Sequence, residues 1–278
     1  MSSEKFFTTK KALITLIAAS LVVIVSLGIR QTFGLFFFDF NADLNISISH
    51  FGFVIGLQLL MWGVFSPIFG FITDRYGGAT AIFIGFLFYL AGLFLFYSGL
   101  NTGYLFTLTI GLLIGIGLGG TAISIPVSVV AKHFPSSNRT IATGIVTCAG
   151  SFGFFVSPLL VRYSLIEIGW EITILYFCFL LGIGLITALF ISTPKTPVGN
   201  NDNNNQTAKE ALIEAFNNNS FIFLTLGFFV CGWHIALVAT HIPTYMMDRG
   251  MPDWTAAMIL ALVGAVSYTH LTLPTIYS

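Results

Sequence analysis

The sequence predicts an all-α protein that crosses a membrane several times, and three observations support this class. Of the 278 residues, 56% are hydrophobic and only 8% are charged, whereas a soluble domain carries about 25% charged residues. The apolar residues fall in runs of about 20, the length that a helix needs to cross the hydrocarbon core. These runs are continuous and do not alternate with polar residues, which excludes the strands of a membrane β-barrel.

The predicted spans begin close to the N-terminus. Lys5, Lys10 and Lys11 precede the first apolar run, but that run is longer than the roughly 7–15 residues of a signal peptide, and no small-residue cleavage site follows it. We therefore interpret it as a membrane span. The predicted spans are 12–37, 51–73, 79–99, 104–131, 140–163, 171–193 and 220–242, and an eighth apolar run begins near Thr255.

The positive charges between these spans predict the orientation of the chain. Short loops rich in Lys and Arg stay in the cytoplasm. Only Arg162 and Arg249 lie on one side of the predicted membrane. On the other side lie Lys5, Lys10, Lys11, Arg75, Lys132, Arg139, Lys195 and Lys209. We expect a multi-pass protein of the cell inner (plasma) membrane with its N-terminus in the cytoplasm.

The chain divides into four predicted regions. Residues 1–193 form a six-helix transmembrane bundle, and residues 194–219, which include an Asn-rich run, form a cytoplasmic linker. Residues 220–266 begin a second bundle. The remaining residues, 267–278, place His270 and Pro274 where apolar residues are expected. They are a natural chain end, a short re-entrant segment, or sequence foreign to the native protein; we favour the third, which predicts a truncated chain.

A charged motif, GFITDRYGG at 70–78, lies between the second and third predicted spans. Asp74 can cap a neighbouring helix N-terminus, and Arg75 can pair with a carboxylate or a lipid phosphate. The motif resembles the signature loop of the major facilitator superfamily, G-x-x-x-D-R-x-G-R-R. The matching residues are Gly70, Asp74, Arg75 and Gly77.

This resemblance implies a cytoplasmic latch that breaks when the transporter changes conformation. Gly78 and Ala79 replace the basic pair of the family pattern, which implies a weaker latch. The alternative interpretation is a charged turn that only fixes the topology.

An arginine lies within the first predicted span. Arg30 is 18 residues after Ala12, about 27 Å along a helix, which places it in the outer half of the membrane. Such an arginine normally faces a cavity or a partner, and its guanidinium can bind a carboxylate with two hydrogen bonds. The alternative is an interfacial anchor. Gln31 points about 100° away from Arg30 and need not share its role.

Two histidines, His234 and His241, lie seven residues apart in the seventh predicted span and share a face. An imidazole titrates near physiological pH, so either histidine is a candidate for proton coupling, and His234 is also a candidate for a hydrogen bond to substrate. The alternative is a structural histidine bonded to a neighbouring helix. Pro243 is expected to kink or end this span.

Two stretches make the resemblance more specific. RQTFGLFF at 30–37 and CGWHIALVATHIP at 231–243 resemble bacterial members of the monocarboxylate-porter branch, which includes oxalate/formate exchangers. The similarity extends over 13–266 and implies a helical bundle of twelve spans around a central cavity, of which seven to eight are present here. It implies that spans one, four and seven line the cavity, with Arg30 and His234 as substrate-binding residues.

The fourth predicted span carries small residues at helical spacing. Gly111, Gly115 and Gly119 let neighbouring helices approach closely. Ser124 and Pro126 then favour a bent, cavity-lining helix. The G-x-G-x-x-G pattern in the same span does not indicate a dinucleotide site, because no strand precedes it.

These patterns favour secondary active transport of a small organic anion, with a monocarboxylate as the expected substrate. Alternating access would be driven by proton symport or by exchange for a counter-anion. The alternative is an exporter of drug-like or hydrophobic solutes on the same fold.

We predict no catalytic residues, metal ligands or cofactor, because the sequence shows no constellation for an enzyme, and no domain is large enough for a sensor. The expected partners are the substrate and the lipid bilayer, without nucleic acid because the net charge is zero, and the expected full-length state is a monomer.

Overall fold

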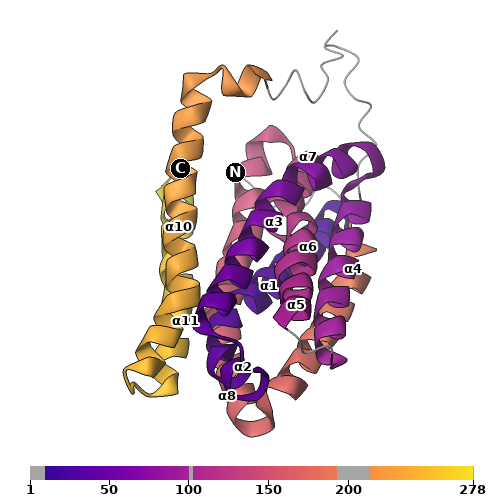
Figure 1. Cartoon of the computed structure of the whole chain (residues 1–278). Coiled ribbons are helices and arrows are strands. Elements are labelled where there is room, and N and C mark those ends of the chain that lie inside the picture. The colour runs from indigo at the N-terminus through magenta and orange to yellow at the C-terminus, as the bar shows by residue number, and fades with distance from the viewer. Residues whose placement is uncertain (1–9, 100–102, 193–212, 278) are drawn as a thin grey trace.

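The computed structural model describes residues 10–99, 103–192 and 213–277, excluding the side chains of 253 and 268–277 (Figure 1). These residues form helices and no strands. The elements are α1 (Lys10–Gln31), η2 (Phe33–Phe36), α2 (Phe37–Leu44), α3 (Ile48–Tyr76), α4 (Gly78–Tyr97), α5 (Gly103–Phe106), η3 (Thr107–Leu113), α6 (Ile114–Thr121), α7 (Ser124–His133), α8 (Ser136–Ala188), α10 (Asn219–Asp248) and α11 (Asp253–Tyr277). The predicted all-α membrane bundle is therefore confirmed.

Six helical segments of the described residues are long and apolar enough to cross a membrane. Several are composites of the elements above. The segment Lys10–Leu44 joins α1, η2 and α2, and Gly103–His133 joins α5, η3, α6 and α7. Within the second of these, η3 is a π-helical turn, a local widening that often marks functional sites.

Helix α8 contains both the fifth and the sixth predicted spans. Its 53 residues would extend about 80 Å as a straight helix, far more than the roughly 30 Å of a hydrocarbon core. The helix is broken at Gly169, where φ is 80° and ψ is 171°. Only glycine adopts such a conformation readily, so the chain reverses there and crosses the membrane twice.

The C-terminal helix continues further than the sequence predicts. The apolar part of α11 covers Trp254–Ser267, which agrees with an apolar run that stops near Val266, but the helical backbone continues to Tyr277. A helix satisfies its own backbone hydrogen bonds, so it does not need apolar side chains to continue. Most of the predicted linker, 194–212, lies outside the described residues, and the foreign origin of 267–278 stays a prediction.

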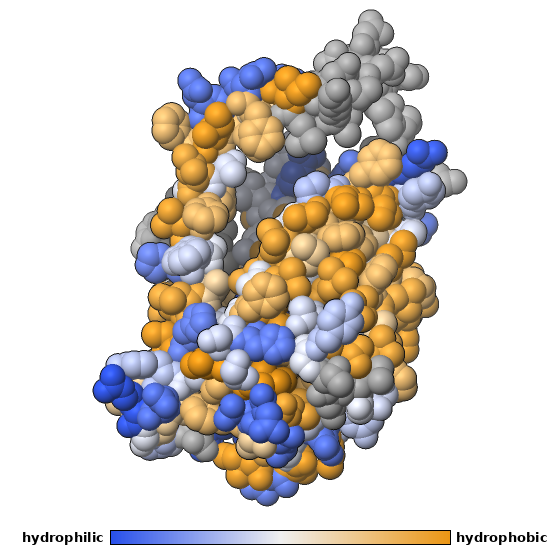
Figure 2. All heavy atoms as spheres, viewed as in Figure 1, coloured by the Kyte–Doolittle hydropathy of each residue, from blue (hydrophilic) through white to orange (hydrophobic). Residues whose placement is uncertain are grey.

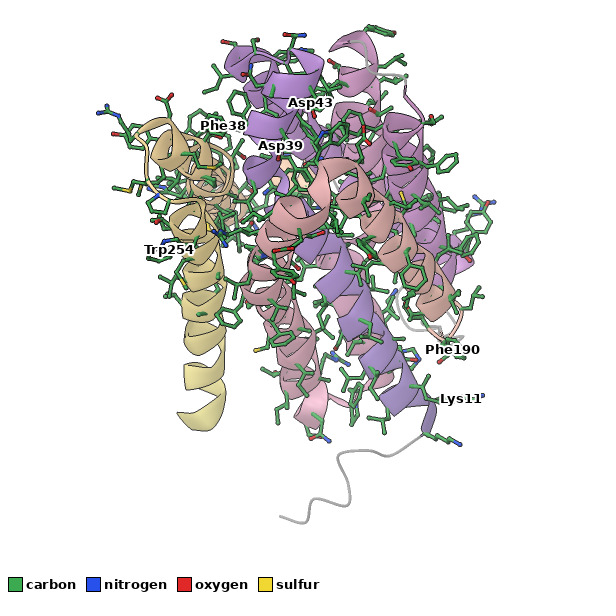
Figure 3. All side chains as sticks on the ribbon, turned by 90° about the horizontal axis from the view of Figure 1, so that it is seen from below. Lys11, Phe38, Asp39, Asp43, Phe190 and Trp254 are labelled. Carbon is green, nitrogen blue, oxygen red and sulfur yellow. The ribbon has the colours of Figure 1, made fainter. Side chains whose placement is uncertain are left out.

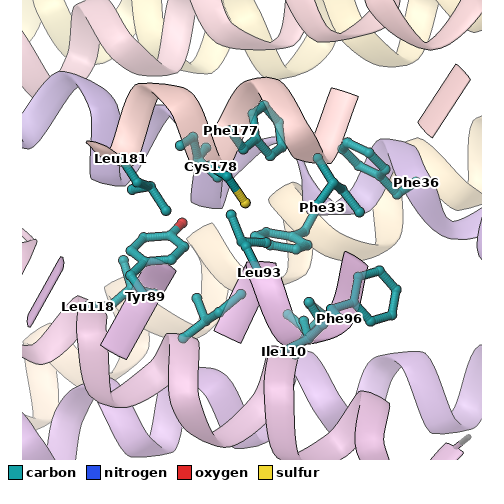
Figure 4. Close-up of a cluster of buried hydrophobic side chains, with 14 of the residues drawn as sticks. Phe33, Phe36, Tyr89, Leu93, Phe96, Ile110, Leu118, Phe177, Cys178 and Leu181 are labelled. Atoms are coloured by element: carbon teal, nitrogen blue, oxygen red, sulfur yellow. The ribbon is translucent and has the colours of Figure 1, made fainter. Parts of the chain in front are cut away.

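Aromatic side chains fill the centre of the first six spans (Figure 4). The ring of Phe40 lies 5.3 Å from that of Phe96 and 5.4 Å from that of Trp170, both edge-on. Trp170 also donates a hydrogen bond of 2.7 Å from its Nε1 to Oδ2 of Asp43. Figure 3 shows Asp43 and Asp39 on α2 at the end of the bundle that faces the viewer. This cluster joins the first, third, fourth and sixth spans at the predicted extracellular end, here called the outer end.

The glycines of the fourth span let α6 pack between two neighbours. A Cβ on Gly115 would lie 2.7 Å from the carbonyl oxygen of Gln58 in α3. On the opposite side, a Cβ on Gly117 would lie 2.7 Å from the carbonyl oxygen of Gly85 in α4. Gly119 likewise faces Phe65 of α3. The glycine stripe therefore sits at helix contacts that no larger residue could occupy without a shift.

The fourth span bends where the stripe ends. Helix α6 ends at Thr121, the next residue Ala122 is extended with a ψ of −163°, and α7 starts at Ser124. The side chain of Pro126 is buried, whereas that of Ser124 is exposed and lines a cavity beside α3.

Helices α10 and α11 lie side by side next to this bundle (Figure 1). Hydrophobic residues cover much of the face seen in Figure 2, and hydrophilic residues gather toward its two ends. Gly264 of α11 packs closely on α8, since a Cβ there would lie 2.5 Å from the backbone nitrogen of Phe155. The start of the second predicted half is thus attached mainly through α8.

Candidate functional site

The guanidinium of Arg30 is buried near the C-terminal end of α1. The residue is only 5% exposed, and its Nε and Nη2 atoms have no hydrogen-bond partner among the residues that the structure describes. The structure also gives Arg30 no ion pair with any Asp or Glu among the residues that it describes. A buried charge without a partner is strongly unfavourable. The burial of Arg30 without a charged partner in the described residues makes it a candidate for binding an anion.

The surroundings of Arg30 are polar on one side. Tyr89 of α4 is its electrostatic neighbour, and the Tyr89 hydroxyl donates a hydrogen bond of 3.3 Å to the carbonyl oxygen of Ser26, one turn before Arg30. Tyr89 is fully buried with Leu93, Leu118 and Leu181 around it (Figure 4). The phenol fixes this part of α1 but supplies no negative charge while it is protonated.

Two glutamines are also buried: Gln31, the next residue after Arg30, and Gln58 of α3. Gln31 is 1% exposed, and neither its Nε2 nor its Oε1 has a partner in the described part of the chain. Gln58 donates from Nε2 to the carbonyl oxygen of Ile110 in the π-helical turn at 3.0 Å, but its Oε1 is also unpartnered. Buried polar groups are normally hydrogen-bonded. Arg30 and Gln31 stand out because each has two unpartnered buried atoms in the described part of the chain, whereas Ser20, Gln58 and Arg162 have one each.

The two predicted histidines occupy a different place. His234 and His241 are both exposed on α10, and no described interaction joins either one to Arg30. The His241 ring packs against α3, where a Cβ on Gly52 would lie 3.3 Å from its Cε1. The sequence predicted that Arg30 and His234 share a site, and the structure does not bring them into contact.

A groove of 930 Å³ separates α3 from α10. On the α10 side of the groove, the polar side chains of Thr240 and His241 line the wall. His234 does not line the groove. The remaining wall is apolar apart from the two indole nitrogens, and it includes Ile55, Leu59, Leu60, Trp62, Val64, Phe229, Trp233, Ala236 and Leu237.

The two stretches that carry the sequence resemblance meet in space. Gly34 of η2 lies against α10, and a Cβ on Gly34 would lie 2.5 Å from the carbonyl oxygen of Ala239 and 3.3 Å from Cγ of Pro243. Ala239 and Pro243 are buried there, together with Thr240 and Thr244. This contact closes the outer end between the first span and the seventh.

The predicted latch residues lie at the opposite end of α3. Asp74 forms an ion pair of 2.8 Å with Lys132 of α7, rather than capping a helix, and Arg75 stacks on the ring of Tyr76 at 5.6 Å. Gly77 has a φ of 96° and joins α3 to α4. Gly70 lines a cavity of 500 Å³ between α3 and α7, next to the ion pair.

Sequence reasoning missed three of these features. In the sequence, Lys132 indicates only the topology, because nothing pairs it with Asp74. Helical direction separates Gln31 from Arg30, although a second polar residue beside an intramembrane arginine is the available signal. The role of Gly34 depends on the approach of α10, which no local pattern reveals.

Comparisons with known proteins agree with this architecture of a multi-pass helical membrane protein. The family model of the Major Facilitator Superfamily matches residues 19–272, so the chain belongs to that family. The structure of a D-xylose-proton symporter has the same fold, with a TM-score of 0.63 at 16% identity over 93% of this chain and 66% of that one.

Three relatives with 23–26% sequence identity differ in their named functions. An agnestins efflux protein from Paecilomyces divaricatus is 25% identical over 96% of this chain and 60% of its own length. A probable nitrate transporter from Staphylococcus carnosus is 26% identical over 56% and 39%. A hexuronate transporter from Bacillus subtilis is 23% identical over 79% and 53%. The chain therefore spans only part of the length of these relatives.

Proposed function

We propose that the protein carries out secondary active transport of a small organic anion, a monocarboxylate, across the plasma membrane. The observation that carries this proposal is the buried, unpaired guanidinium of Arg30. A carboxylate would supply the missing charge and accept hydrogen bonds from both unused nitrogen atoms, an arrangement that arginine favours. The names of two relatives, a nitrate transporter and a hexuronate transporter, support an anion.

Alternating access would proceed by movement of the second half against the first. In this arrangement the outer end is closed by the contact of Gly34 with Ala239, while residues 219–235 of α10 are exposed toward the predicted cytoplasmic end. This distribution fits a conformation open to the cytoplasm, with the N-terminus on that side. The ion pair of Asp74 with Lys132 would be the latch that breaks and reforms.

The driving force is proposed as proton symport or as exchange for a counter-anion. His234 and His241 are the candidate proton carriers, since imidazole changes its charge near physiological pH. Transport that keeps its pH profile in His234→Gln and His241→Gln variants would remove both histidines from this role and leave exchange.

A second candidate function is favoured by one feature, the largely apolar groove between α3 and α10. Pockets lined by hydrophobic and aromatic side chains suit drug-like solutes, and one relative is named as an efflux protein. Export of a hydrophobic solute would depend on Trp62 and Trp233 rather than on Arg30.

The two functions are separated by reconstituting the chain in proteoliposomes and measuring uptake of radiolabelled propionate. We expect Arg30→Met to abolish uptake and Arg30→Lys to retain part of it, because lysine keeps the charge but loses the two-pronged geometry. Arg139→Met, which removes an exposed arginine, is the matched control and should transport normally. Unchanged uptake in both Arg30 variants would contradict the role of Arg30 as the carboxylate-binding residue. No uptake of propionate by the unchanged chain would contradict the anion proposal and favour the hydrophobic solute.

A further inference from the structure

Gln31 holds polar atoms that no other part of the described structure uses. Its side-chain amide has one acceptor and one donor group, and both lie buried without a partner. Leaving such a group unpaired costs about 1–3 kcal/mol. An apolar residue at this position would avoid that cost. The buried amide is therefore a candidate for hydrogen bonding to a ligand.

Gln31 lies at the junction between the first six-helix bundle and the start of the second predicted half. Three residues earlier, Gly28 lies directly against the Ser157 side chain of α8; three residues later, Gly34 lies against Ala239 of α10. Gln31 is the last residue of α1, where the chain tightens into η2. The amide therefore sits where the first span, the fifth span and the seventh span come together.

The chemistry of Gln31 differs from that of its neighbour. Arg30 offers only donors, whereas Gln31 offers a donor and an acceptor. The Cα atoms of consecutive residues are about 3.8 Å apart, so the two side chains start from neighbouring points on α1. Their directions differ by about 100°, so the two side chains would engage different groups of a ligand.

We propose that Gln31 is a specificity-determining residue that binds a hydroxyl group next to the carboxylate held by Arg30, so that the preferred substrate is a hydroxycarboxylate. This inference rests on the proposed anion transport. A hydroxyl can donate to Oε1 and accept from Nε2, which satisfies both atoms. A site built around a substrate hydroxyl rejects the analogue that lacks it, because the buried protein groups are then left unpaired.

The test measures binding by calorimetry to the purified chain in lipid nanodiscs, with lactate and propionate as probes. These two acids have the same carbon skeleton and differ only in the hydroxyl group. We expect the wild-type chain to bind lactate at least about tenfold more tightly than propionate. Gln31→Met, which keeps the length but has no strong donor or acceptor, should bind both acids equally and retain its affinity for propionate.

A second variant and a matched control keep the test decisive. Gln31→Glu keeps the shape but places a second negative charge near the carboxylate, and it should weaken binding of both acids. Thr187→Val removes a hydroxyl of α8 that is already bonded to the carbonyl oxygen of Gly184, and it should keep the preference for lactate. Size-exclusion chromatography and circular dichroism check that every variant is folded.

The outcomes separate this inference from the proposed function. Binding of both acids by the wild type without a preference, or a preference that survives in folded Gln31→Met, would overturn the role of Gln31 alone. Binding of neither acid by the wild type would overturn the proposed anion function, and the inference with it. Loss of all binding in Arg30→Met, with loss of only the preference in Gln31→Met, is the result that we expect.

Discussion

The two ends of α10 differ in how deeply their side chains are buried. At the outer end, Ala239, Thr240, Pro243 and Thr244 are buried against the first span. Along 219–235 every residue is exposed, although the composition of the helix is equally apolar there. Apolar composition therefore does not decide which part of α10 packs on the bundle.

This difference in burial follows from how closely the helix backbones approach each other, and not from hydrophobicity. Gly34 brings η2 within van der Waals contact of the α10 backbone, and close packing of this kind stabilises helix contacts in lipid, where no hydrophobic driving force acts between helices. The exposed glycines of α10, Gly227 and Gly232, have no atom within 4 Å of a Cβ placed on them. Helix α10 thus packs on the first bundle only at its outer end, while α11 lies beside it.

The largest effect is expected inside the first bundle, where packing is tight on both sides of a helix. Gly117→Leu would force side-chain atoms into the α4 backbone at Gly85 and Tyr89. Overpacking a close-packed core costs about 1–3 kcal/mol or more, so we expect a lower thermal midpoint and poor recovery of folded protein. Gly182→Leu, at a position with no neighbour within 4 Å, should melt like the wild type; equal melting of both variants would show that the bundle is not close-packed.

The next effect tests the outer contact itself. Gly34→Val should separate η2 from Ala239, because its side chain cannot fit at 2.5 Å from a carbonyl oxygen. We expect a Thr240→Cys reporter, buried in the parent chain, to become reactive to a membrane-impermeant thiol reagent. Gly56→Val, on α3 with open space around it, is the control. If the Thr240→Cys reporter stays unreactive in Gly34→Val, close packing at Gly34 is not what distinguishes the buried outer end of α10 from its exposed end.

A smaller effect concerns the ion pair at the inner end of α3. Asp74 and Lys132 are 73% and 39% exposed, and exposed pairs contribute only about 0–1 kcal/mol. We expect Asp74→Asn and Lys132→Met each to leave the thermal midpoint nearly unchanged. If the pair is a latch, each single variant should alter the transport rate, and the double variant should resemble either single one. Additive effects on the rate would argue that the two residues act separately.

The smallest effect is expected in the exposed part of α10. Gly232→Ala adds a methyl group to open space and removes a glycine from a helix interior, which favours the helix by about 1 kcal/mol or less. Stability should rise slightly or stay constant. A clear loss of stability would show that this stretch packs against another part of the chain.

Much of the fold could be predicted from the sequence, because membrane spans are set by local composition. The apolar runs located every spanning segment, and the break at Gly169 lies in the predicted loop between the fifth and sixth spans. The extent of α11 could not be predicted in this way, since hydropathy reports the apolar length and not the helical length. The π-helical turn η3 likewise depends on packing and on Gln58.

Less of the candidate site could be predicted. Arg30 was identified because a charge within a span is conspicuous, and its burial agrees with a functional role, which stays a proposal. The pairing of Arg30 with His234 could not be judged from spacing along the chain, because it depends on how two distant helices approach. The contact of Gly34 with Ala239 and the ion pair of Asp74 with Lys132 also join distant segments, and no local pattern encodes them.

The central claim is that anion binding at Arg30 moves α10 relative to the first bundle, so that the inner end closes and the outer contact opens. The most direct test places spin labels in a chain whose three native cysteines are replaced, at Ile48 and Tyr245 for the outer end and at Tyr76 and Phe221 for the inner end, all of them exposed positions. We predict that saturating lactate shortens the inner distance, lengthens the outer distance, and does neither in Arg30→Met. Distances that stay fixed, or that change in the same direction at both ends, would contradict the account.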